Sequence, residues 1–322
     1  MRIVLALGGN ALLQRGQALT AENQLANIKK AAASIAKIAK DNELVIVHGN
    51  GPQVGLLMEQ NAAYKEVSAE TTPYPMDVLG AQTCGMVGYM LQKELRNEDK
   101  AQGVISLLTQ TLVSKNDSAF SNPTKFVGPV YSEAEAKQIM RDNSELIFKE
   151  DGNYYRRVVA SPTPLAIVEI EQIETLLQHN NVVIAGGGGG VPISMDSMEQ
   201  ISGVECVIDK DSTAQLMAER LNADMFIILT DGPVYEDFGK PTEKAIKCIS
   251  PKTLNEYDFP AGSMGPKIEA VCKFVEASNN SSAIGSLYEL SDIVTGNAGT
   301  HIFSQCEREY YPDLSDIRKA SF

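Results

Sequence analysis

The sequence has no tryptophan and few of the side chains that usually bind metals: five cysteines and three histidines among 322 residues. The cysteines are scattered and form no C-x-x-C pair, so we expect neither a zinc site nor a disulfide framework. Each is expected to be a small buried side chain. The histidines lie far apart, which excludes a helical histidine pair as a metal ligand. We therefore expect no metal site built by the protein.

A surplus of basic residues and a long hydrophobic run are also missing. The formal net charge of −13 argues against a nucleic-acid groove, which needs a basic footprint. A few lysines can still form a local positive site for a small anion. No apolar run approaches the ~18 residues of a membrane span, and the first residues lack the features of a signal peptide. These absences favour a cytoplasmic protein that binds neither nucleic acid nor membrane.

Short apolar runs that end in glycine-rich turns are the main pattern that is present. Strands are expected at residues 2–7, 44–48, 104–109, 182 onward, 226–230, 246–250, 283–287 and 300–303. Helices are expected from residue 25, from residue 52, at 77–95 and 171–178, after residue 211, and from residue 266. Repeated alternation of strand, turn and helix predicts an α/β sandwich with a mostly parallel sheet.

Two segments depart from this alternation. Between about residues 114 and 160, β-like pieces at 126–131 and 153–159 flank a polar helix at 133–141, which predicts a small inserted subdomain. Lys125 stands where it begins, although a single lysine in a loop is usually solvated. The helix expected at 77–95 carries small residues on one side, which suit packing within the chain or against a second subunit equally well.

The stretch from residue 182 to 221 combines two features that suit a phosphate. Five consecutive glycines, Gly186 to Gly190, let backbone N–H groups approach a ligand. Lys210 then opens an amphipathic helix, whose amino end favours anions. A tight turn and a solvated lysine are the alternative interpretation. No G-K-[ST] follows the glycines, and GNGPQVG lacks the spacing of the dinucleotide fingerprint.

The remaining polar residues point to phosphoryl transfer. No Ser-His-Asp set or Cys-His pair is evident, which leaves Lys210, Lys267 and Lys125, with Asp211 beside the first. Lys267 lies early in a helix, where a cation opposes the dipole unless an anion is near. Phosphoryl transfer needs mainly positioning and positive charge, and one carboxylate such as Asp211 can accept from two lysines. We infer transfer from a nucleotide, carrying Mg²⁺, to a small acid.

Successive motifs then identify a family. VLALGGNALLQRG, VHGNGPQVGLL, PYPMDVLGAQTCGMVGYML, NPTKFVGP, RRVVASP, AGGGGGVPI, VIDKD and AGSMGPKIEAV resemble, in order, those of carbamate kinases in the amino acid kinase superfamily. The resemblance runs from residue 1 to about residue 302. The segment KEDGNYYRRVVASP is similar to the branch associated with allantoin and oxamate breakdown.

The resemblance implies a three-layer αβα sandwich around an open eight-stranded sheet, a homodimer, and ATP or ADP with Mg²⁺. It implies the reaction carbamoyl phosphate + ADP ⇌ carbamate + ATP, with carbamate breaking down to ammonia and CO₂ in fermentative nitrogen catabolism. Residues 1–205, with the insert, would form the carbamate and carbamoyl-phosphate lobe. Residues 206–322 would form the nucleotide lobe and a C-terminal tail.

The resemblance also implies roles for individual residues. Lys210 and Lys267 would clamp phosphate, Asp211 would organise them, and Lys125 would close over carbamoyl phosphate. Phosphate and substrate binding is implied for Gly8, Gly9, Asn10, Gly49, Asn50, Gly51, Gly187 and Gly188. Nucleotide binding is implied for Asp231, Tyr235 and Met264.

Two departures and two rival interpretations accompany the resemblance. TDGPVY, at residues 230–235, is one residue shorter than the family's TDVDxVY, and the chain continues some twenty residues past GTHI, where relatives usually stop. One rival is another amino acid kinase-type enzyme acting on a carboxylate or nucleoside monophosphate, but several of those place a lysine where this chain has Ala6. The other is a non-catalytic ligand sensor, which would lack a phosphate lysine, and none is missing.

Overall fold

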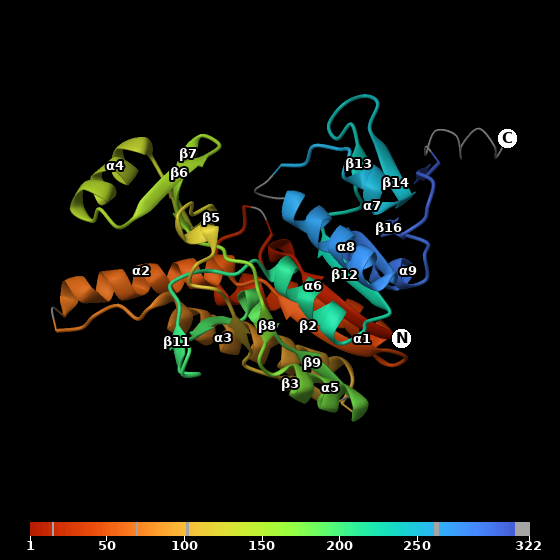
Figure 1. The fold of residues 1–322 in the computed structure, drawn as a ribbon, viewed down its shortest axis with the longest axis horizontal. Coiled ribbons are helices and arrows are strands. Elements are labelled where there is room, and N and C mark those ends of the chain that lie inside the picture. Colours follow the sequence, from red (N-terminus) through yellow and green to blue (C-terminus); the bar gives the residue numbers. More distant parts are fainter. Residues whose placement is uncertain (15, 69, 101–102, 261–263, 313–322) are drawn as a thin grey trace.

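A computed structural model describes residues 1–14, 16–68, 70–100, 103–260 and 264–312. Its main feature is a ten-stranded sheet of order β13-β14-β16-β15-β12-β1-β2-β9-β3, with β17 beside β14 (Figure 1). The strands are β1 (Arg2–Leu7), β2 (Glu43–His48), β3 (Gly103–Ser106), β9 (Asn181–Ile184), β12 (Met225–Thr230), β13 (Tyr235–Glu236), β14 (Lys244–Ile249), β15 (Ser281–Ser286), β16 (Thr300–Ile302) and β17 (Glu309–Tyr310). The eight expected strands are all present, and the two-residue strands β13 and β17 extend one edge.

The centre of the sheet is parallel. β1 pairs in parallel with β2 and β12, β9 lies between β2 and β3 in the same sense, and β12 pairs in parallel with β15. β16 runs antiparallel to β15. Central parallel strands are covered on both faces, which explains why RIVLAL and ELVIVH are nearly continuous apolar runs rather than alternating ones.

Helices cover both faces of the sheet, giving the expected αβα sandwich. The helices of the described residues, of which α4 belongs to the insert, are α1 (Ala21–Ala39), α2 (Gly51–Val67), α3 (Met76–Glu98), α4 (Glu133–Asp142), α5 (Ile170–Gln178), α6 (Lys210–Arg220), α7 (Pro251–Leu254), α8 (Gly265–Ser278) and α9 (Leu290–Val294), with short 3₁₀ turns η1 (Gly9–Ala11), η2 (Ser118–Phe120), η3 (Gly187–Gly189) and η4 (Leu287–Glu289). Alternate residues of β1 enter opposite cores: Val4 packs with α5, α6 and α8, and Ile3 packs with α1, α3 and α9. Each core draws on both halves of the chain. No helix in the described residues is long and apolar enough to cross a membrane.

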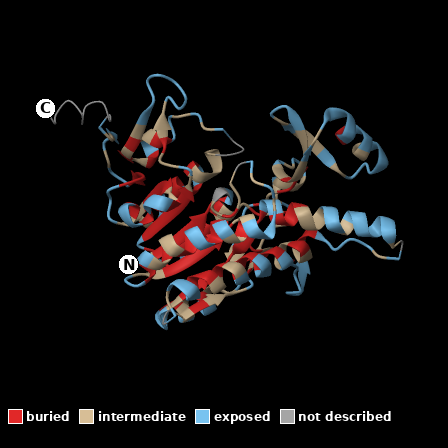
Figure 2. Cartoon of the chain, turned by 180° about the vertical axis from the view of Figure 1, so that it is seen from behind, coloured by how far each residue is buried: buried red, intermediate tan, exposed pale blue. Residues whose placement is uncertain are grey.

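The insert forms a separate small lobe that projects from the sandwich (Figures 1 and 2). It consists of α4 and an antiparallel sheet of order β5-β7-β6, with β5 (Lys125–Tyr131), β6 (Ile147–Asp151) and β7 (Tyr154–Val159). Its base contacts α2 at two glycines: a Cβ placed on Gly55 would lie 2.6 Å from the Cα of Gly128. The far end of α2 is exposed beneath the lobe (Figure 2).

The strand expected at residues 104–109 ends early, because the chain leaves the main sheet after Ser106. A four-stranded sheet of order β11-β10-β4-β8 takes over, with β4 (Gln110–Leu112), β8 (Ala166–Ile167), β10 (Val191–Met195) and β11 (Ile201–Gly203). Thr109 makes the crossing. Its hydroxyl accepts from the amide of Gly186 at 2.9 Å, and its carbonyl accepts from the amide of Val191 at 2.8 Å.

The cysteine prediction is correct for three residues and wrong for two. Cys84, Cys206 and Cys272 are free and buried, as expected. Cys248 and Cys306 form a disulfide across a sequence separation of 58 residues. The pairing of β17 with β14 brings the chain after β16 back beside β14, and spacing along the sequence gives no sign of this return.

Candidate active site

The site residues expected from the sequence follow four neighbouring strands at their carboxyl ends. Gly8 follows β1, Gly49 follows β2, Gly186 lies just past β9, and Asp231 follows β12. From β1 the chain builds one side of the sheet through β2, β9 and β3, and the other side begins at β12. Open α/β sheets bind ligands at the carboxyl ends of strands where the strand order reverses. The candidate site therefore lies at the junction of β1 and β12.

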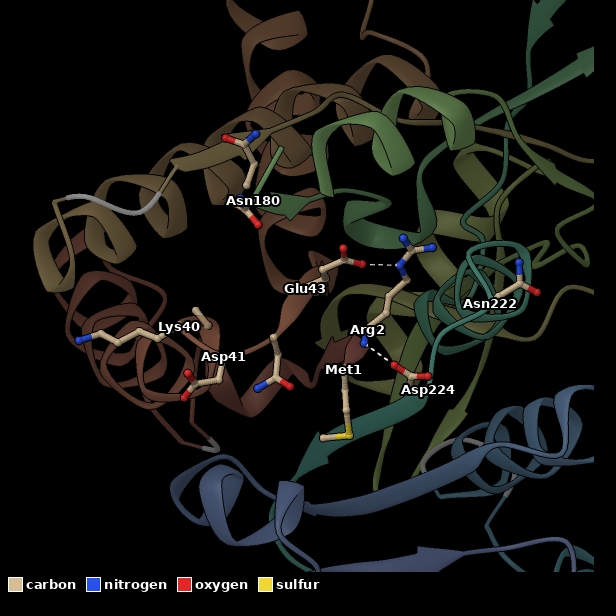
Figure 3. A pocket seen from close by; sticks show the side chains of 11 residues that line it. Met1, Arg2, Lys40, Asp41, Glu43, Asn180, Asn222 and Asp224 are labelled. Atoms are coloured by element: carbon tan, nitrogen blue, oxygen red, sulfur yellow. Dashed lines mark hydrogen bonds and ion pairs between the residues drawn. The ribbon is translucent and has the colours of Figure 1, made fainter. Parts of the chain in front are cut away.

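A cavity at the opposite edge of the sheet does not share this geometry. It has a volume of about 600 Å³ and is lined by residues at the amino ends of the strands, including Arg2, Glu43 and Asp224 (Figure 3). The guanidinium of Arg2 donates to Glu43 at 2.7 Å, and its amide donates to Asp224 at 2.7 Å. These bonds link β1 to β2 and to the residue before β12 at the amino ends of the strands, which gives Arg2 a structural role.

Asp211 joins two lysines at the centre of the candidate site. Its Oδ1 accepts from Lys210 Nζ, and its Oδ2 accepts from Lys267 Nζ at 3.2 Å. Asp211 is buried. Burial lowers the pKa of Lys210, and the neighbouring Asp211 carboxylate opposes that shift. The lysines lie in the first turns of α6 and α8, so two ammonium groups and two helix amino ends share one small region.

Asp209 is a residue of this site that the sequence analysis did not single out. Its Oδ1 caps α6 by accepting from the amide of Asp211 at 2.8 Å, and its Oδ2 accepts from Lys125 Nζ at 2.5 Å. Lys125 is therefore ion-paired and lies over the start of α6. Burial raises the pKa of Asp209, but the Lys125 ammonium outweighs it and leaves that pKa well below its usual range. An aspartate just before an expected helix predicts an N-cap, but nothing in the sequence predicts its second partner.

The five glycines after β9 are buried and tightly packed. Gly186, Gly188, Gly189 and Gly190 have positive φ angles, which glycine adopts without steric cost. A Cβ on Gly187 would lie 2.4 Å from the His48 ring, and one on Gly188 would lie 2.1 Å from the Asn50 amide. The glycines thus let the loop after β2 pack against the loop after β9. Gly187 and Gly188 lie behind His48 and Asn50.

The loop after β2 reaches the lysines. A Cβ on Gly49 would lie 3.5 Å from Cδ of Lys210, so this backbone runs along the lysine stem. Asn50 is buried and donates to Thr83 Oγ1 at 2.8 Å, and Gly51 begins α2. His48 donates from Nδ1 to the Gly49 carbonyl at 2.9 Å. Burial, aided by Lys210, lowers the pKa of His48 to about 4, so its imidazole is neutral.

The loop after β1 lies beside the end of β12. The amide of Gly8 donates to the Leu229 carbonyl at 2.9 Å, and a Cβ on Gly8 would lie 2.6 Å from that oxygen. Only glycine allows the two backbones this close. Gly9 is exposed and begins η1, which also contains Asn10.

The three expected nucleotide residues occupy two segments. Asp231 is exposed beside a cavity of about 250 Å³ at the end of β12, and Tyr235 lies in β13. Met264 is the N-cap of α8, and its carbonyl accepts from the amide of Lys267 at 3.0 Å. Residues 261–263, just before it, lie outside the described part of the chain. The two segments are joined where Tyr257 Oη donates to Glu236 at 3.0 Å.

This arrangement can stabilise negative charge on a transferring group. Three lysines gather around Asp209 and Asp211, and backbone amides lie near at the ends of β1 and β2. Fixed cations in a site with little water stabilise the equatorial oxygens of a phosphoryl group. Among the described residues, no cluster of three or more His, Cys, Asp or Glu side chains could hold a metal ion.

Comparison with known proteins agrees with this chemistry. Residues 1–286 match the amino acid kinase family. The chain is 50% identical over 309 residues to a carbamate kinase of Haemophilus influenzae, covering 95% of this chain and 98% of the relative. It is 43% identical to a carbamate kinase of Pyrococcus furiosus, covering 94% and 98%.

Solved structures give the same result. A carbamate kinase from Giardia lamblia bound to AMP-PNP superposes with a TM-score of 0.85 at 40% identity, covering 94% of this chain and 98% of that one. A UMP kinase from Bacillus anthracis superposes with a TM-score of only 0.53 at 15% identity. That second likeness concerns the fold alone.

Proposed function

The chain belongs to the amino acid kinase family, within which its close relatives are carbamate kinases, and we propose that it transfers a phosphoryl group reversibly between carbamoyl phosphate and ADP. The observation that carries this proposal is the Asp211 carboxylate, which holds Lys210 and Lys267 side by side where the strand order of the sheet reverses. The products in the direction of ATP synthesis are ATP and carbamate, which releases ammonia and CO₂.

The reaction requires little from the protein beyond charge and position. An oxygen of the ADP β-phosphate attacks phosphorus, the bond from phosphorus to the carbamoyl oxygen breaks, and carbamate leaves as an anion. The charges balance without a proton transfer, so the reaction requires no general base. We assign Lys210 and Lys267 to the phosphoryl oxygens and Asp211 to holding both lysines. Lys125 is assigned to carbamoyl phosphate.

The glycine-rich loops complete the proposed substrate site. The backbone of Gly8, Gly9 and Asn10 would hold the transferring phosphate, and Gly49, Asn50 and Gly51 would face the carbamate end. Gly187 and Gly188, behind His48 and Asn50, would support that end. Residues 1–205 would then supply the carbamate half, and residues 206–322 would supply the nucleotide half through Asp231, Tyr235 and Met264.

Mg²⁺ fits this site as a companion of the nucleotide. Mg²⁺ in phosphoryl-transfer enzymes is commonly held by substrate phosphates with few protein ligands, and both oxygens of Asp211 already accept from lysines. Bound in this way, the ion would neutralise charge on the nucleotide phosphates. We therefore expect activity to require Mg²⁺.

A homodimer and a cytoplasmic location complete the proposal. Gly85, Met86 and Tyr89 form an exposed strip on α3, whereas Cys84 and Gly88 pack within the chain. This strip suits a second subunit, and sedimentation equilibrium tests it, since a mass near one chain's 34.8 kDa contradicts it. Fractionation of cells tests the location. Disulfides such as Cys248–Cys306 are rare in the cytosol, so the free thiols of the protein should also be titrated in fresh extract.

The first prediction tests the reaction and its lysines. Purified protein mixed with carbamoyl phosphate, ADP and Mg²⁺ should form ATP, and omission of Mg²⁺ should abolish this. Lys210→Ala and Lys267→Ala should each lower kcat by ~10²-fold or more, the usual effect of losing a preorganised electrostatic donor. Lys273→Ala is the matched control, because Lys273 is exposed on the same helix as Lys267 and pairs with Glu269.

Each outcome has a separate meaning. Absence of ATP from the unaltered protein would rule out the carbamate kinase reaction and leave the two rival interpretations. Phosphorylation of another carboxylate or a nucleoside monophosphate by ATP would favour a different amino acid kinase activity. Binding without turnover would favour a ligand sensor. Full activity of Lys210→Ala or Lys267→Ala would contradict the residue assignment while leaving the reaction intact.

A further inference from the structure

The chain after β16 returns to the nucleotide half and forms a strap, residues 304–312, across its surface. β17 pairs with β14, the amide of Tyr311 donates to the Ala245 carbonyl at 3.0 Å, and Tyr311 Oη donates to the Gly299 carbonyl at 2.8 Å. The Cys248–Cys306 disulfide adds a covalent link. The strap is thus fastened along β14, next to the short strand β13 that carries Tyr235.

Four polar side chains, drawn from the strap, β13 and the connection after α7, form one hydrogen-bonded cluster. Glu236 accepts at Oε1 from Tyr257 Oη at 3.0 Å and from Arg308 Nη1 at 3.0 Å, and at Oε2 from Tyr310 Oη. Arg308 also donates to Tyr257, and its guanidinium lies 5.3 Å from the centre of the Tyr310 ring. One carboxylate therefore gathers two side chains of the strap and one residue from beyond α7.

The joined residues belong to the two segments that carry the nucleotide residues. Glu236 follows Tyr235 directly, and Tyr257 lies in the connection from α7 to α8, which leads to Met264. Tyr257 and Phe259 are only partly buried where they pack against the core, and an open groove of about 440 Å³ runs between this connection and α8. The hydrogen bond from Tyr257 to Glu236 adds a polar restraint to this partial packing.

We propose that the strap, through Arg308, Tyr310 and Glu236, holds the two walls of the nucleotide pocket at the spacing that ADP requires. This rests on the proposed function, because Tyr235 and Met264 are nucleotide residues only within it. The contacts of the strap lie on β13, β14, Gly299 and Tyr257. Lys210, Lys267 and Asp211 are not among them. Arg308 and Tyr310 are therefore positioning residues whose effect falls on nucleotide binding.

The test separates nucleotide binding from phosphoryl transfer. Arg308→Ala and Tyr310→Phe should each raise KM for ADP about three- to tenfold, as expected for a partly exposed charge-assisted bond. The kcat and KM for carbamoyl phosphate should change less than about twofold. Arg308→Lys should restore part of the loss. Glu309→Gln is the matched control, because Glu309 lies in the same strand and pairs with Lys247 instead.

A double-mutant cycle tests the route of the effect. In a Glu236→Ala background, Arg308→Ala should add almost nothing to KM for ADP. The proposal is overturned if Arg308→Ala leaves KM for ADP unchanged while lowering the melting temperature, or if kcat and both KM values change together. Calorimetric Kd values for ADP in the same variants measure nucleotide affinity without relying on the catalytic reaction. If the unaltered protein makes no ATP, the proposed function fails, and these constants still decide whether the strap sets nucleotide affinity.

Discussion

At the scale of single residues, the site depends on two adjacent carboxylates that divide three lysines between them. Asp211 forms ion pairs with Lys210 and Lys267. Asp209 forms an ion pair with Lys125 and also caps α6. An ammonium group has three donors, so a lysine that is held by one carboxylate oxygen can also donate to a substrate oxygen. The carboxylates thus hold the ammonium groups in place without using all of their N–H donors.

Asp209→Asn should separate the charge of Asp209 from its capping role. Asparagine also caps helices well, so stability should change little, whereas Lys125 loses its anchor. We expect KM for carbamoyl phosphate to rise about fivefold to tenfold, as for a weakened hydrogen bond to a charged group, with KM for ADP unchanged. Steady-state kinetics measure both constants.

The control for this variant is a cycle with Lys125→Ala. If Asp209 acts through Lys125, the Asp209→Asn effect should vanish once Lys125 is gone. Additive effects of the two substitutions would contradict that mechanism.

The residue types of the site could be read from the sequence, but not all of their partners. One carboxylate between Lys210 and Lys267 follows from elementary charge pairing once both lysines are assigned to helix starts. The Lys125–Asp209 pair spans 84 residues, and the Glu236 cluster joins three separate segments. Such contacts depend on how elements meet, which periodicity and caps do not encode.

At the scale of elements, close contacts of backbones set the arrangement. Gly55 of α2 and Gly128 of β5 meet where side chains would collide. This contact seats the small subdomain on α2 and so places Lys125 over α6. Glycines in the sequence predict turns, but Gly55 lies inside a helix, and its reason is visible only in the partner element.

Gly55→Ala should therefore displace the subdomain. The added Cβ would lie 2.6 Å from Gly128 Cα and 3.0 Å from its nitrogen, so backbone must move, at a cost of about 1–3 kcal/mol. We expect lower stability by urea unfolding together with a raised KM for carbamoyl phosphate.

Gly80→Ala in α3 is the matched helical control. A Cβ there has open space, so the substitution should be neutral or stabilise by up to about 1 kcal/mol. Unchanged stability and kinetics in Gly55→Ala would show that the contact does not hold the subdomain.

At the scale of the whole molecule, the buried neutral His48 links stability to pH. The pKa of His48 is about 4 in the folded chain, against about 6.5 when unfolded. As pH falls from about 6.5 to 4, His48 binds a proton in the unfolded chain but stays neutral in the folded chain. Folding should lose about 3 kcal/mol from this residue across that window, measured by urea unfolding at several pH values.

His48→Gln should flatten this part of the stability curve. Comparing the variant with the unaltered chain isolates His48 from other titrating groups. His179→Gln, at an exposed position, should leave the slope unchanged. A constant difference between His48→Gln and the unaltered chain from pH 7.5 to 4 would contradict the linkage.

The overall architecture was largely predictable, because strand and helix periodicity is strong in a buried parallel sheet. The αβα sandwich and the eight longer strands follow from apolar runs ending in glycine turns. The return of the chain after Ile302, its disulfide and the edge strands β13 and β17 did not follow. Strands of two residues leave no periodic signal, and their pairing depends on segments far apart in sequence.

Lys125 and Val159 face each other at the first and last positions of the paired strands β5 and β7. The chain therefore enters and leaves the projecting lobe at the same place, and the residues between form a closed loop on the sandwich. The entropy cost of closing such a loop grows only with the logarithm of its length. The lobe can therefore be lengthened or shortened without changing the strand order of the main sheet, while Lys125 would stay at its base.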